Sequence, residues 1–224
     1  MMRRKCVLGV SALLSVAVMT VTVTCASAAQ AGPGADQLRE AASCAEQISA
    51  GEFSEDAGGE RTIAVCSTGP AVHWKSDFDI DCDGQRTDEC NEETDPSFLP
   101  ETAWQQSDGQ PLDSARLPYV VVPSVNATWD FRGAGIDGGT VAAVVHGDKV
   151  AYAVVGDIGP ENMIGEGSYR LAEQLGIDPD PATGGVSGAV VDFILFPGVS
   201  VDVIEDNAAA ITAGEAAASA FVGG

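Results

Sequence analysis

Short apolar runs rich in valine, each bounded by turn-forming residues, constrain the fold of this chain more than any other feature. Residues 118–123 (PYVVVP) lie between two prolines, and residues 141–146 and 150–155 flank the tripeptide Gly147-Asp148-Lys149. Runs of this kind predict strands, and two runs separated by a short glycine-containing turn predict a β-hairpin. Residues 190–196 predict a further strand. The sequence therefore indicates a β-rich fold.

Only a few segments have a helical pattern. Apolar residues recur near helical spacing after Asp36, which predicts a helix at about 36–49, and residues 168–175 predict a second helix that ends at Gly176. The Ala-rich residues 207–222 predict a third. Residues 63–74 read as two short strands joined by a Gly-Pro turn, and the acid-dense residues 77–95 as an irregular loop.

The N-terminus has the pattern of a secretory signal. Arg3, Arg4 and Lys5 precede a long uncharged apolar run, and Ala26-Ser27-Ala28 offers the small residues that a signal peptidase needs. We therefore expect cleavage after residue 28, a secreted extracellular protein with no membrane association after cleavage, and a single domain at 29–224. An uncleaved anchor is the alternative, because the apolar run is long.

Four cysteines follow the signal segment. In an exported chain they indicate two disulfides, for which three pairings are possible. We favour the two short closures. No Cys-x-x-Cys spacing or histidine pair supports zinc, so we expect no metal and no cofactor. The four cysteines and the favoured pairs are Cys44 with Cys66 and Cys82 with Cys90.

Charge restricts the partners. The chain has 33 acidic and 11 basic residues, a net charge of -22, and no basic stripe. Nucleic-acid binding depends on clustered Lys and Arg, so nucleic acid is excluded as an expected partner. A cationic ligand fits better, although acidity that only keeps a secreted protein soluble is the alternative. We expect a monomer.

Two carboxylates stand out by their position. Asp157 follows an apolar strand directly, and Glu166 lies between Gly165 and Gly167 just before the second predicted helix. Gly159-Pro160 predicts a turn between them. A protonated carboxyl and an ionised one are the minimal equipment for glycosidic bond hydrolysis. From the residues alone, a turn residue and a helix cap are the alternative interpretation.

Five motifs in order resemble a known family. The segments DIDCDG, LPYVVVPS, VAAVV, YAVVGD and IGEGS are similar to those of the glycoside hydrolase family 75 chitosanases; they lie at residues 79–84, 117–124, 141–145, 152–157 and 164–168. The resemblance implies endo-hydrolysis of β-1,4-linked glucosamine polymers with inversion. It also implies that Asp157 and Glu166 are the catalytic pair.

The resemblance implies a division of roles as well. Glu166 would protonate the leaving oxygen and Asp157 would activate water, with the two carboxyls about 6.5–9.5 Å apart. Chitosan, a cationic polysaccharide, would meet a local ladder of acids beside Cys82. The expected substrate-binding residues are Asp79, Asp81, Asp83, Tyr152 and Ser168.

A second resemblance concerns the fold. Residues 150–177 are similar to the strand, Asp-x-Gly-Pro turn and helix of double-psi β-barrels, which by analogy implies a small six-stranded barrel. Some domains of that type act on peptidoglycan, so a peptidoglycan lytic enzyme is an alternative function.

A calcium-binding loop is a further alternative. Asp79-x-Asp81-x-Asp83-Gly84 matches the first half of such a loop, but Cys90 stands where the bidentate Glu is required. In that reading the protein would be a non-catalytic polysaccharide- or calcium-binding module.

Overall fold

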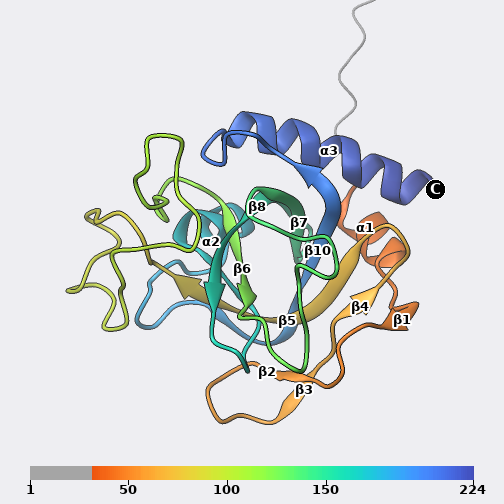
Figure 1. The fold of residues 1–224 in the computed structure, drawn as a ribbon, viewed down its shortest axis with the longest axis horizontal. Coiled ribbons are helices and arrows are strands. Elements are labelled where there is room, and N and C mark those ends of the chain that lie inside the picture. Colours follow the sequence, from red (N-terminus) through yellow and green to blue (C-terminus); the bar gives the residue numbers. More distant parts are fainter. Residues whose placement is uncertain (1–31) are drawn as a thin grey trace, which may run out of the picture. The chain divides into compact units, whose positions relative to one another are not determined.

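The computed structural model describes residues 32–224; the expected signal segment, residues 1–28, lies outside them. Six strands form a closed barrel in the order β5, β10, β7, β8, β6, β9, and β9 pairs with β5 to complete the ring (Figure 1). The expected β-rich fold with a six-stranded barrel is confirmed. The strands are β5 Val72–Asp81, β6 Tyr119–Pro123, β7 Thr140–His146, β8 Lys149–Gly159, β9 Glu166–Ser168 and β10 Val186–Ser200.

The barrel is apolar on both sides of its central strands. On β7, Val144 packs in the interior cluster with Phe193 and Trp74, whose rings stack with centroids 5.2 Å apart, whereas Val145 belongs to a second cluster outside the barrel. A strand covered on both faces is apolar at successive positions, which is why residues 141–145 form a continuous apolar run rather than an alternating one.

Helix α3, Asn207–Gly223, covers this outer face (Figure 1). It buries Ala210, Gly214 and Ala218, which are four residues apart and so lie along one side of the helix. Their small size lets the helix approach the barrel closely. Helix α2, Tyr169–Leu175, is capped by Ser168 at its start and by Gly176 at its end, within one residue of the predicted helix at 168–175.

The expected helix at 36–49 is wrong in its length, because α1 spans only Ala35–Ala41. Beyond it the Cys44–Cys66 disulfide draws the chain alongside the next strands. Strand β1, Glu46–Gln47, pairs there with β4, Cys66–Ser67, which in turn pairs with β5. Tertiary pairing therefore overrides the helical spacing of the apolar residues.

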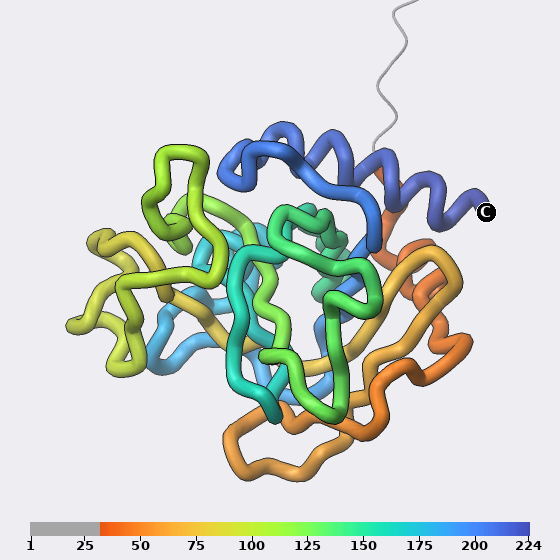
Figure 2. The backbone as a smooth tube through the Cα atoms, in the orientation of Figure 1, coloured from red at the N-terminus to blue at the C-terminus, as the bar shows by residue number. Residues whose placement is uncertain are grey.

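The interpretation of residues 77–95 as an irregular loop is also wrong in part, because residues 77–81 complete β5. The long connection from there to β6, yellow to light green in Figure 2, lies beside one end of the barrel. A separate two-stranded sheet consists of β2, Phe53–Ser54, and β3, Arg61–Ile63. Among residues 32–224, no helix has the length and apolar character needed to cross a bilayer.

Candidate active site

A β-bulge determines the direction of the Asp157 side chain. Val120 pairs with Val155, but the next residue, Val121, pairs with Asp157, so Gly156 is an extra residue in β8. Strict alternation would place Asp157 on the interior face with Val155. The bulge instead turns it to the outer face, and the Cβ of any other residue at 156 would lie 2.6 Å from Tyr119 Cβ.

Asp157 is held by the main chain. Its Oδ1 accepts hydrogen bonds from the N–H groups of Ala103 and Ile158, both at 2.7 Å, and the residue is 6% exposed. Burial raises the pKa of Asp157, whereas the two N–H donors lower it by favouring the ionised form. The net pKa is raised above its usual value, and the two N–H donors fix the carboxyl group in place.

Glu166, the first residue of β9, lies against the backbone of β8. A Cβ at Gly159 would overlap Oε2 of Glu166, so the absence of a side chain at 159 makes room for the carboxyl group. No residue in the described part of the chain donates a hydrogen bond to the Glu166 side chain. Burial, followed by the charges of Asp79, Asp157 and Asp83, raises its pKa to about 7. A carboxyl group in this state can donate a proton near neutral pH.

Both carboxyl groups open into one cleft of about 340 Å³. Five acidic residues line it, and no Lys, Arg or His is among its lining residues. The remaining walls are apolar or small. The acids are Asp81, Asp83, Asp95, Asp157 and Glu166.

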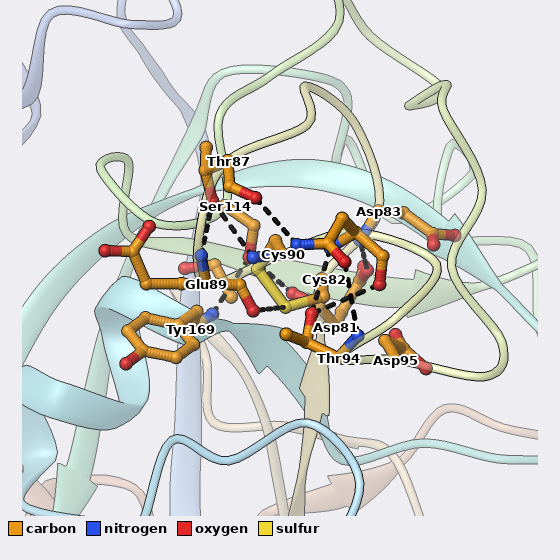
Figure 3. Close-up of a disulfide and its surroundings, with 12 residues drawn as sticks. Asp81, Cys82, Asp83, Thr87, Glu89, Cys90, Thr94, Asp95, Ser114 and Tyr169 are labelled. Carbon is orange, nitrogen blue, oxygen red and sulfur yellow. Dashed lines mark hydrogen bonds between the residues drawn. A yellow bond between two sulfur atoms is a disulfide. The ribbon is translucent and has the colours of Figure 1, made fainter.

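The second disulfide anchors the segment that carries Asp81 and Asp83, because Cys82 lies between them in the sequence. Cys82 and Cys90 are bonded, as are Cys44 and Cys66, so the favoured pairing is confirmed. Figure 3 shows Asp83 and Asp95 on one side of the Cys82–Cys90 bond and Glu89 and Tyr169 on the other.

Hydrogen bonds between the main chain and the acids complete this wall. Asp81 Oδ1 accepts the Asp83 N–H at 2.8 Å, and Asp83 Oδ1 accepts the Leu99 N–H at 2.6 Å. Burial raises the pKa of Asp83 to about 6, against the Leu99 hydrogen bond, which lowers it. The pKa of Asp81 is raised as well, by burial and then by the charge of Asp157.

The loop between Asp157 and Glu166 forms hydrogen bonds with segments outside the barrel. Ser54 on β2 donates its N–H to Asn162 O at 3.0 Å and accepts the Ile164 N–H at 3.3 Å through its own carbonyl oxygen. Asn126 Nδ2 donates to Glu161 O at 2.6 Å. Residues 160–165 are therefore bound on two sides, which fixes Glu166 relative to Asp157.

The acidic segment at residues 79–84 does not fold as a calcium-binding loop. Asp79 and Asp81 lie on strand β5 rather than on a turn. Carboxylate oxygens of Asp81, Asp83 and Asp157 do lie within 4.8 Å of one another. Each of these three already accepts a main-chain N–H, and we assign no metal to them.

Three expected substrate-binding residues do not line the cleft. Tyr152 lies on the outer face of β8 in the cluster beneath α1 and α3, against Gly214. Ser168 is fully buried, and its Oγ accepts the N–H groups of Tyr119 and Leu171, so it positions β6 and caps α2. Asp79 is not a lining residue either, but its charge acts on Glu166.

The sequence analysis missed two residues of the site. Asp95 lines the cleft and lies 7% exposed, but nothing in the local pattern separates it from the other acids of its segment. Gly159 was assigned to a turn, whereas it is the last residue of β8 and accommodates Glu166. The short spacing between Asp157 and Gly159 was the signal in the sequence that could have placed Gly159 in the site.

Comparison with known proteins gives the family of this chain. Residues 78–221 match the family described as fungal chitosanase of glycosyl hydrolase group 75. The chain belongs to this family of glycosidases. It is 28% identical over 173 residues to an endo-chitosanase of Aspergillus oryzae, covering 69% of this chain and 70% of the relative. It is also 29% identical over 135 residues to endo-chitosanase C of the same species, covering 59% of this chain and 33% of the relative.

The region that matches glycosyl hydrolase group 75 contains the whole cleft. It begins at Phe78 and so includes the acidic half of β5 together with Asp157 and Glu166. It leaves out β1 to β4 and the first half of β5. The resemblance found in the sequence is therefore confirmed at the level of the family.

Proposed function

We propose that this protein is a secreted endo-chitosanase that hydrolyses β-1,4 bonds between glucosamine residues with inversion. The observation that carries the proposal is the cleft: five carboxyl groups line it without a basic residue among them. Deacetylated chitosan carries an ammonium group on each sugar at mildly acidic pH. A cleft of this charge binds and steers such a polymer.

Glu166 is the general acid in this proposal. It has no hydrogen-bond donor among the described residues to favour its ionised form, and its pKa of about 7 keeps it protonated at mildly acidic pH. Its proton passes to the glycosidic oxygen as the bond to the leaving sugar breaks.

Asp157 is the general base. Two main-chain N–H groups favour its carboxylate form and fix its orientation. It removes a proton from a water molecule that attacks the anomeric carbon from the face opposite the leaving group, which inverts the configuration.

Secretion is part of the proposal. The signal pattern at residues 1–28 and two disulfides support export to an oxidising compartment. We further propose that the mature protein acts as a monomer and needs no cofactor.

One set of assays tests the function. The wild-type protein is incubated with highly deacetylated chitosan, chitin and peptidoglycan, reducing ends are measured, and the first product anomer is identified by NMR. We expect release from chitosan with the α-anomer formed first. Release from peptidoglycan alone would indicate a lytic enzyme, and release from none would indicate a binding module; either result contradicts the proposal.

Variants test the residue roles. Asp157→Asn and Glu166→Gln keep the shape of each side chain but remove its acid–base function. Each should lower kcat by at least about 10²- to 10⁴-fold with little change in the unfolding temperature. A variant with a near-wild-type rate would refute that residue's role.

A further inference from the structure

Asp79 and Glu166 occupy paired positions on neighbouring strands. Strands β5 and β9 are parallel, and Asp79 lies opposite Glu166 in their register. The Asp79 N–H donates to Gly165 O at 2.9 Å, which fixes the register at this point. Paired residues of adjacent strands project from the same face of the sheet, with the strands about 4.8 Å apart. The strand pairing therefore holds two carboxyl groups side by side.

No positive charge of residues 32–224 neutralises this pair. Among the described residues, neither side chain has a hydrogen-bond partner or an ion pair. The groups that face Glu166 are Asp79 from β5, Asp83 from the segment after it, and Asp157 from β8. Those that face Asp79 are Glu55 and Asp56, which follow β2, and Asp77 from β5 itself. Every neighbour is acidic, so the pair cannot readily carry two negative charges.

The two members of the pair differ in access to substrate. Glu166 lines the cleft, whereas Asp79 is not among the residues that line it. A proton held by Glu166 can therefore reach a bound sugar, and the negative charge remains on Asp79. This places Asp79 outside direct contact with the reacting atoms.

We propose that Asp79 is a positioning residue for catalysis, whose negative charge, held beside Glu166 by the strand pairing, keeps the proton on Glu166 until the glycosidic oxygen takes it. The inference rests on the proposed function of Glu166 as the general acid. It replaces the expected contact of Asp79 with sugar by an electrostatic role.

The charge of Asp79 also favours the step in which Glu166 regains its proton after each reaction. When the bond to the leaving sugar breaks, its oxygen takes the Glu166 proton, and the attacking water gives a proton to Asp157. Glu166 is then ionised beside Asp79, which is unfavourable. A proton passing from Asp157 to Glu166 through solvent restores both groups and balances the reaction.

The test is the pH dependence of kcat/KM for chitosan oligomers in Asp79→Asn. Removing the charge lowers the pKa of Glu166, so the alkaline limb of the profile should move to lower pH by about one unit. Such a shift reduces the protonated fraction at pH 7 about fivefold and changes the rate at pH 5 less than about twofold. Asp79→Glu, which restores the charge, should restore most of the rate at pH 7.

Asp56→Asn is the matched control, because it removes one negative charge nearby that does not act directly on Glu166. Its alkaline limb should stay where it is in the wild type. An unmoved limb in Asp79→Asn, an equal shift in Asp56→Asn, or a loss of rate equal at every pH would overturn the inference.

A direct measurement separates this inference from the proposed function. Carbon-13 NMR of the Glu166 carboxyl group in the full chain follows its titration without any substrate. A lower pKa in Asp79→Asn supports the inference, and an unchanged one overturns it. Failure of the wild type to hydrolyse chitosan would instead contradict the proposed function, and the titration would still decide the pairing.

Discussion

A single methyl group at residue 159 should disable the site while leaving the barrel intact. Gly159 is not among the glycines with positive φ, so its backbone accepts alanine. The alanine side chain does not fit, because its Cβ would overlap Oε2 of Glu166 and lie 2.9 Å from Val121 Cγ1. The Glu166 carboxyl group must therefore move.

The size of the effect follows from that overlap. To regain an ordinary contact distance the Glu166 oxygen must shift by about 1 Å, and a misplacement of this size costs about 10²-fold in rate. Crowding costs about 1–3 kcal/mol, partly offset by the about 0.4–1 kcal/mol that Gly→Ala contributes through the unfolded state. The unfolding temperature should then fall by no more than about 8 °C.

The assay is kcat/KM on chitosan oligomers for Gly159→Ala, with thermal unfolding measured on the same sample. Gly51→Ala is the matched control, because its Cβ would meet only Thr128, at 3.6 Å, and its φ is not positive either. It should keep the wild-type rate. If Gly159→Ala retains more than a third of the wild-type kcat/KM, the proposed accommodation of Glu166 by Gly159 is wrong.

Three further predictions follow from the charges. First, kcat/KM on chitosan should fall about tenfold or more between low salt and 1 M NaCl, and less on a more acetylated chitosan with fewer ammonium groups; equal salt dependence on both would contradict steering by the cleft. Second, burial raises the pKa of Asp77 from 3.8 to about 8, and its buried Oδ1 has no hydrogen-bond partner among residues 32–224. Ionising Asp77 is harder in the folded protein than in the unfolded chain, so the wild-type protein loses stability as the pH rises from about 4 through 8. Asp77→Asn should therefore unfold at least about 3 °C higher than the wild type at pH 9 but not at pH 4. A gain that is equal at both pH values would rule out the titration of Asp77 as the cause. Third, EDTA should change neither the rate nor the unfolding temperature, whereas a calcium-dependent rise in unfolding temperature that EDTA abolishes would favour the calcium-binding alternative.

The sequence was most informative where structure is local. Valine-rich runs bounded by proline or glycine became β6, β7 and β8, and α2 ends at Gly176 as expected. These features depend on neighbours in the chain, so a single sequence contains them. The positions of Asp157 and Glu166, at a strand end and before a helix, were predictable for the same reason.

Features that depend on distant pairing were not predictable. The three-residue strand β9 has no local signal of its own and exists because β5 and β6 flank it. Asp79 and Glu166 lie beside each other only because β5 and β9 pair. Tyr152 was expected to bind substrate, but the alternation along β8 and the cover of α3 place it in the outer core. The Gly156 bulge, which reverses the face of Asp157, is likewise a property of the β6–β8 register.

The two hydrogen bonds between Ser54 and the loop at residues 160–165 have a consequence for how this family diversifies. Ser54 precedes Phe78, where the match to glycosyl hydrolase group 75 begins, yet it fixes the stretch of chain between the proposed acid and base. The family match leaves the β2–β3 sheet out. A change in the β2–β3 sheet would therefore alter the placement of Glu166 without any substitution in the cleft, so inherited differences in product length or bond preference can originate in a part of the chain that comparison of the shared region would overlook.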